Sequence, residues 1–105
     1  MKVKDVFDAI EKNGLPKAKG YFLKDAAGVE FDTRLPLEPT SGCALGQAAF
    51  NLGRSPRYIC AVLNSRSNEI TTYIVNQNDN TNKTLPQIAA SAREVFSDLL
   101  EEELI

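Results

Sequence analysis

Cys43 and Cys60 are the only thiols in the sequence, and a thiol can act as a nucleophile or as a redox centre. Cys43 is expected in the first turn of a helix, where unpaired amide groups and the positive end of the helix dipole stabilise a thiolate. Two cysteines without an export signal more often stay reduced and pack as small apolar residues. The sequence therefore favours a core role for both, with an enzyme or redox protein that uses Cys43 as the alternative.

Several basic side chains could converge on one anionic ligand, because ammonium and guanidinium groups bind phosphates and carboxylates. Together with Cys43, the predicted ligand-binding residues are Lys17, Lys19, Arg54, Arg57, Tyr58 and Arg66. The competing interpretation is that these are solvated charges at the ends of helices and strands, which is the common role of surface arginines.

Other chemistries lack the residues that they need. The sequence contains no histidine, so histidine-dependent triads and the usual zinc sites are excluded. It has no glycine-rich phosphate-binding motif, and the run 78–82 lacks the glycine and the distal glutamate of a calcium-binding loop. A formal net charge of -2 offers no large positive field for a phosphate backbone. We therefore expect no catalytic residues, no metal and no cofactor, and the charge argues against nucleic acid as a partner.

Length and composition are those of one folded domain that spans residues 1–105. Apolar residues make up 43% and charged residues 25% of the chain, far from the range in which chains stay disordered. No apolar run reaches the roughly eighteen residues that cross a bilayer, and Met1–Lys4 leads into a charged amphipathic segment. The sequence therefore predicts a cytoplasmic protein without membrane association.

The first forty residues predict one helix and one β-hairpin. Apolar residues at three- and four-residue steps from Val3 to Ile10 indicate a short helix, which Asn13-Gly14 would end. Alternation over 17–23 and again over 29–33 then indicates a hairpin, with Gly28 in the turn. The following stretch, 35–40, holds two prolines and is expected to be an irregular connector.

The remainder of the chain is predicted to be mainly helical, which makes the fold class α+β. A helix rich in small residues should run from Cys43 to a glycine stop at Gly53, with its internal glycine packed tightly on a neighbour. Residues 54–76 favour two short helices, and a second β-hairpin is the alternative. The polar run 77–82 is expected to be an exposed loop, and Thr84–Glu103 a long amphipathic helix.

The segment 42–49, Gly-Cys-Ala-Leu-Gly-Gln-Ala-Ala, resembles the Cys-Ala-Leu-Gly-Ala-Ala element of small uncharacterised proteins, many of them encoded by phages and prophages. In those proteins an Asn-Asp turn and a helix that opens with Ile-Ala follow, as 78–79 and 88–89 do here. Gln47 departs from the alanine of the element, and Gln77 from the leucine that usually precedes the Asn-Asp pair. The resemblance implies helices after Gly53 and an origin in a phage or mobile element, and it implies no activity.

Because the sequence contains no recognisable set of catalytic residues, we expect a non-catalytic binding or regulatory module. Its concave face, between the hairpin and the small-residue helix, would hold an unknown protein or a small anionic ligand. The alternatives are an enzyme or redox protein that uses Cys43, and a small structural or assembly protein that forms a homodimer.

Overall fold

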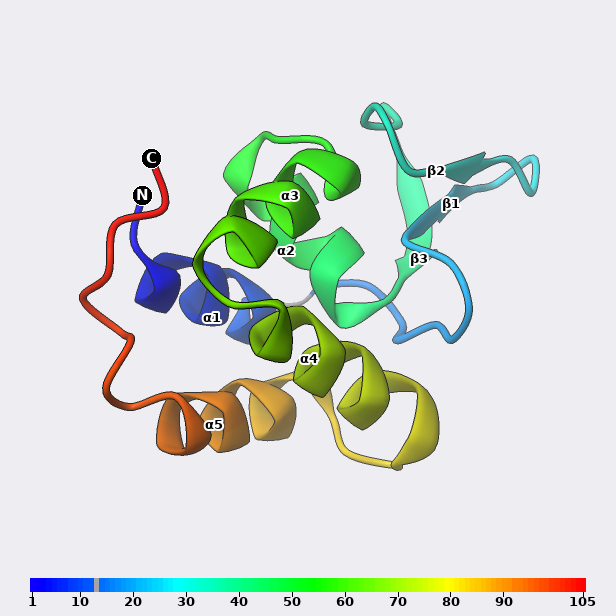
Figure 1. The fold of residues 1–105 in the computed structure, drawn as a ribbon. Coiled ribbons are helices and arrows are strands. Elements are labelled where there is room, and N and C mark those ends of the chain that lie inside the picture. The colour runs from blue at the N-terminus through cyan, green and yellow to red at the C-terminus, as the bar shows by residue number, and fades with distance from the viewer. Residues whose placement is uncertain (13) are drawn as a thin grey trace.

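Five helices and a three-stranded antiparallel sheet make up the described part of the chain, residues 1–12 and 14–105, in the computed structural model (Figure 1). The helices are α1 (Val3–Glu11), α2 (Ala44–Leu52), α3 (Pro56–Arg66), α4 (Asn68–Asn80) and α5 (Leu85–Val95). The strands are β1 (Leu23–Asp25), β2 (Glu30–Phe31) and β3 (Pro39–Gly42). The α+β class, the N-terminal helix and the helical second half are confirmed, while Asn13 lies outside the described residues.

The helices begin and end at local signals in the sequence. Ser55, Ser67 and Thr84 each accept a backbone amide at the start of α3, α4 and α5, which supplies a partner for a donor that has none within the helix. Gly53 ends α2 with a φ of 70°, a conformation that glycine adopts without steric cost. Two helices therefore occupy the stretch 54–76, as expected, and the alternative of a second hairpin is wrong.

The last helix is shorter than the predicted Thr84–Glu103. The helix α5 ends at Val95, and hydrogen-bonded turns follow, in which the Leu99 amide donates to Phe96 and the Glu102 amide to Leu99. Glutamates at the negative end of a helix dipole disfavour its continuation. The chain after residue 100 pairs instead with the N-terminus, as described below.

The polar run 77–82 is not the exposed loop that its composition predicts, because α4 continues through it to Asn80. Inside this last turn, Asn78 is only 1% exposed. Its side-chain amide bonds to the backbone of Ala44 and Ala18, whereas in an exposed loop it would bond to water.

The sheet has the strand order β2-β1-β3, so β1 is central. The expected hairpin is present, with Leu23 opposite Phe31 across β1 and β2. Its second strand is shorter than the predicted 29–33, and its first shares only Leu23 with the predicted 17–23, where Lys17 makes an isolated bridge with Gly42. The connector 35–40 ends as strand β3, which also pairs with β1. The expectation of an irregular connector is wrong for its last residues, because Pro39 lies on an edge strand, where a missing amide hydrogen is tolerated.

The hydrophobic core lies among the helices, with α1 packed against both α2 and α5. The ring of Phe96 joins two sides of this core, with ring centroids 6.4 Å from Phe7 of α1 and 5.5 Å from Tyr73 of α4. The largest fully buried side chains include Phe7, Ile10, Leu23, Leu45, Ile59, Leu63, Ile70, Ile74, Leu85 and Ile88.

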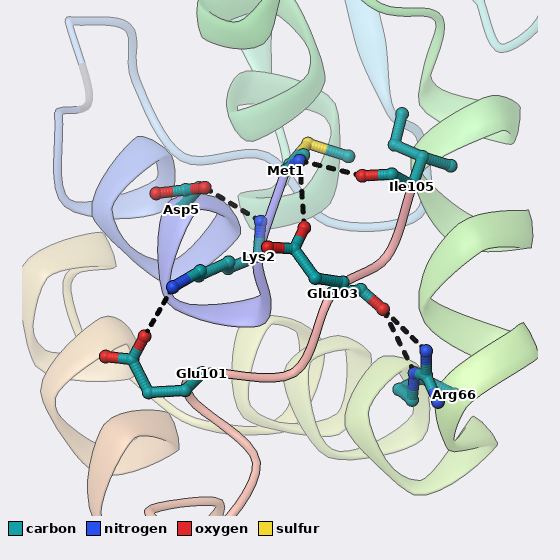
Figure 2. Close-up of polar contacts among 7 residues, drawn as sticks. All are labelled: Met1, Lys2, Asp5, Arg66, Glu101, Glu103 and Ile105. Carbon is teal, nitrogen blue, oxygen red and sulfur yellow. Dashed lines mark hydrogen bonds and ion pairs between the residues drawn. The ribbon is translucent and has the colours of Figure 1, made fainter.

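The C-terminal segment closes the core by pairing with the start of α1. The amide of Val3 donates to the carbonyl of Glu102 at 3.0 Å, and the amide of Lys4 donates to Leu100 at 3.1 Å. Figure 2 shows the side chains that surround this pairing, with the ammonium of Lys2 2.8 Å from a carboxylate oxygen of Glu101. Amides of the first helical turn, which have no partner within the helix, are thereby satisfied by the other end of the chain.

Close contact between α2 and the backbone that leads into β1 fixes the position of the sheet. A Cβ atom placed on Gly46 would lie 1.9 Å from the carbonyl oxygen of Phe22, and one on Gly42 would lie 2.6 Å from the same oxygen. That carbonyl also accepts the amide of Cys43 at 3.0 Å. The tight packing expected of the small-residue helix is therefore made against the hairpin.

Substitution of Gly46 by Ala should strongly destabilise the protein, because the new Cβ would meet the Phe22 carbonyl oxygen at 1.9 Å and the backbone would have to shift. We expect the free energy of unfolding to fall by about 2–4 kcal/mol. Urea unfolding followed by circular dichroism measures this change. Gly14→Ala is the control, since its Cβ has no atom within 4 Å; equal losses in the two variants would contradict the proposed contact.

Candidate functional site

An open groove of about 440 Å³ lies where the sheet, the start of α2 and the second half of α4 meet. Its volume is within the range of small-ligand sites in proteins. The groove is lined by Gly20, Tyr21, Phe22, Glu30, Phe31, Asp32, Cys43, Ala44, Leu45, Val75, Asn78 and Asp79. It occupies the face between hairpin and small-residue helix that the sequence predicted as concave, and α4 adds a wall that the sequence did not reveal.

The lining of the groove combines apolar walls with negative charge. Its large apolar or aromatic side chains are Tyr21, Phe22, Phe31, Leu45 and Val75. Carboxylates come from both sides, with Glu30 and Asp32 on and just after β2 and Asp79 on α4. Among the described residues that line the groove, none is Lys or Arg. The groove is therefore an apolar site with acidic walls.

Cys43 lies in this groove at the residue that precedes α2, close to where the sequence placed it. Its Sγ accepts the amide of Gly46 at 3.4 Å, so the thiol caps the helix. The side chain is only 9% exposed, and burial raises the pKa of Cys43 to about 11, despite the amide groups of Gly46 and Leu45 that favour the thiolate. Burial also raises the pKa of Cys60. Both thiols are therefore protonated at neutral pH.

Asn78 is a site residue that sequence reasoning missed. Its Oδ1 accepts the amide of Ala44 at 3.0 Å, and its Nδ2 donates to the carbonyl of Ala18 at 2.7 Å. One buried amide thus joins α4, the start of α2 and the segment before the sheet. Asparagine within a run of polar residues is typical of a turn, so the sequence held no signal for this role.

Gln47 of α2 has a similar buried role. It is 2% exposed, and its Nε2 donates to the carbonyls of Leu15, Pro16 and Gly42 at 3.0, 3.2 and 2.9 Å. Its Oε1 accepts the amide of Leu15 at 3.3 Å. The available signal was a single large polar residue within a helix of small apolar ones. Gln47 thus supplies the hydrogen bonds of the irregular chain that enters the hairpin.

The predicted lysines do not line the groove. The Lys17 ammonium donates to the carbonyls of Thr81 and Lys83 at 3.2 and 2.7 Å, and burial lowers its pKa. Lys19 is exposed. Lys17 therefore serves to hold the chain after α4 against the segment before the sheet.

The predicted arginines lie at separate places, each with a partner of its own. Arg57 pairs with Asp32 at 3.0 Å, and Arg54 lies over the ring of Tyr58, 5.6 Å from its centroid. Arg66 donates to the carbonyl of Glu103 at 2.7 Å, beside the C-terminal pairing (Figure 2). Of the seven predicted site residues, Cys43 alone lines the groove. The binding of an anionic ligand by this basic set stays a prediction.

Two kinds of site are absent from residues 1–12 and 14–105. In these ranges, no group of three or more Cys, Asp or Glu side chains is close enough to hold a metal ion. The same residues include no helix whose length and apolar character would allow it to traverse a bilayer.

Replacement of Asn78 by Ala should lower the free energy of unfolding by about 2–4 kcal/mol, because the amide of Ala44 and the carbonyl of Ala18 would lose their buried partner. Chemical unfolding monitored by fluorescence or circular dichroism measures the loss. Asn76→Ala, at an exposed position of the same helix, is the matched control and should change stability by less than about 0.5 kcal/mol. A similar small effect of both changes would contradict the role of Asn78.

The buried thiol of Cys43 should make stability depend on pH under alkaline conditions. The pKa of Cys43 rises from 9.0 to about 11, so between these values the unfolded chain releases the proton while the folded chain retains it. The contribution of Cys43 to the free energy of unfolding is fully present below pH 9 and decreases as the pH rises toward 11. In reducing buffer, the free energy of unfolding should fall between pH 9 and pH 11 by about 2 kcal/mol more for the native protein than for Cys43→Ala. Parallel stability curves for the two proteins would disprove the raised pKa.

The segment 42–49, which resembles an element of small phage and prophage proteins, contributes Cys43–Leu45 to the groove. No family model, curated protein or solved structure matches the chain. The resemblance, and with it the origin in a phage or mobile element, therefore stays a prediction.

Proposed function

We propose that the protein is a non-catalytic binding module and that the groove between the sheet, α2 and α4 is its binding site. The observation that carries this proposal is the composition of the groove, which pairs large apolar walls with a small number of polar groups. Ligand sites in proteins combine these two features, because apolar contact supplies affinity and polar groups orient the ligand.

The groove is built on a backbone that is already held in place. The Phe22 carbonyl accepts the Cys43 amide, and Asn78 bonds the amide of Ala44 and the carbonyl of Ala18. Binding to a preformed surface avoids the entropic cost of ordering the site. This rigidity supports a site that holds a ligand.

The state of Cys43 supports binding over thiol chemistry. A thiol whose pKa is about 11 is almost wholly protonated at neutral pH, and the thiolate is the nucleophilic form. The chain has no histidine that could take the proton from the thiol. The groove is therefore better suited to hold a molecule than to react with it. The homodimer considered from the sequence stays an alternative.

Filling the groove should abolish ligand binding without unfolding the protein. Val75 lines the groove and is half-exposed on α4, so Val75→Trp would occupy the groove at little cost to the core. The test is a thermal-shift screen with amines, carboxylates, phosphates, neutral aromatics and short peptides of each charge. A probe at about 100 times its Kd stabilises the native state by about 2.7 kcal/mol, which raises Tm by about 10 °C.

Val95→Trp is the matched control, because Val95 is an exposed valine of α5 that does not line the groove. At least one class of probe should raise the Tm of the native protein and of Val95→Trp, and leave that of Val75→Trp unchanged. If no probe raises Tm, or if both variants respond equally, the groove is not a binding site.

A further inference from the structure

The charges around the groove indicate which kind of molecule it fits. Glu30, Asp32 and Asp79 contribute carboxylates from two walls, and no Lys or Arg is found among the described residues of the lining. We infer that the groove binds a basic linear peptide segment of a partner protein, an inference that rests on the proposed function. An apolar side chain of that segment lies between the walls, and Lys or Arg side chains meet the carboxylates.

The positive groups of the chain itself leave these carboxylates accessible. Arg57 pairs with Asp32, yet both side chains are about half-exposed or more, and an ion pair of this kind contributes only about 0–1 kcal/mol. Lys17 is close enough to Asp79 for the two charges to interact, but its ammonium donates its hydrogen bonds to the carbonyl oxygens of Thr81 and Lys83. Glu30 and Asp79 form no ion pair within 4.0 Å in the described part of the chain.

Two aromatic rings of the lining, those of Tyr21 and Phe31, already hold cations of the chain itself. The chain already places Lys24 over the ring of Tyr21, 4.2 Å from its centroid, and Arg34 over the ring of Phe31 at 4.7 Å. Rings in this setting attract ammonium and guanidinium groups through their negative faces. Because Lys24 and Arg34 already lie on these rings, the attraction of the groove for a basic segment rests on its carboxylates.

The arrangement of the carboxylates favours a peptide over a small amine. A small amine with one cationic group can meet only one wall, whereas Glu30 and Asp79 come from β2 and α4 on different sides of the groove. An extended peptide advances about 3.3 Å per residue, so two basic residues that flank an apolar one lie about 7 Å apart and carry their cationic groups on long, flexible stems. These two groups can meet Glu30 and Asp79 while the apolar side chain contacts Phe22.

Fluorescence anisotropy with three labelled peptides of equal length tests this inference. The first alternates lysine with leucine, the second replaces lysine by glutamate, and the third replaces leucine by serine. The lysine–leucine peptide should bind at least about tenfold more tightly than either of the others, and its affinity should fall as salt screens the charges. Equal binding of the glutamate peptide would overturn the inference.

Charge removal at the groove should weaken this binding. We expect the double variant Glu30→Gln with Asp79→Asn to bind the lysine–leucine peptide about tenfold more weakly. The control is Glu94→Gln with Asp98→Asn, which removes the same two kinds of carboxylate at exposed positions outside the groove lining. Unchanged affinity in the groove variant, or an equal loss in the control, would overturn the inference.

The thermal-shift screen separates failure of this inference from failure of the proposed function. If only neutral or anionic probes, or only small amines, raise Tm through the groove, the groove is a binding site and its assignment to a basic peptide is wrong. If no probe of any class raises Tm, the groove is not a binding site and both proposals fail.

Discussion

The contact between α2 and the backbone at Phe22 is the constraint on which the arrangement of sheet and helices depends. Because Gly42 and Gly46 have no Cβ atom, the Phe22 carbonyl can lie directly against the backbone at the start of α2. Because the helix and the chain meet without intervening side chains, backbone amides at the start of α2 become available to Phe22 and to Asn78. The groove adjoins this contact, since Phe22 and the start of α2 both line it.

Local signals made the helices predictable, while partners distant in the sequence decided the features that were missed. Ser55 and Ser67 cap α3 and α4 through residues next to them, so the sequence alone could indicate both helices. The end of α5 at Val95 depends on pairing with the N-terminus, which no local pattern records. The extension of α4 through its polar residues likewise depends on buried backbone groups that Asn78 satisfies. Composition describes what a segment prefers, and these tertiary partners override that preference.

The candidate site was predictable in place but not in chemistry. A helix of small residues next to a hairpin indicated close packing and a concave face, and Cys43 lies there. Proximity in sequence suggested that Arg54, Arg57 and Arg66 act together, but the ends of α2 and α3 direct them to different partners. The acidic lining comes from three separate segments without a shared motif, so only the folded chain brings it together.

The pairing of the two chain ends has a consequence for folding during synthesis. The amides of Val3 and Lys4 bond to carbonyls of Glu102 and Leu100, which the ribosome adds almost a hundred residues later. Until then, α1 lacks both these bonds and the helix α5 against which it packs. Contacts between the first helix and segments so distant in the sequence slow the formation of the fold, and the part of α1 that packs against α5 stays exposed in the nascent chain until those segments are made.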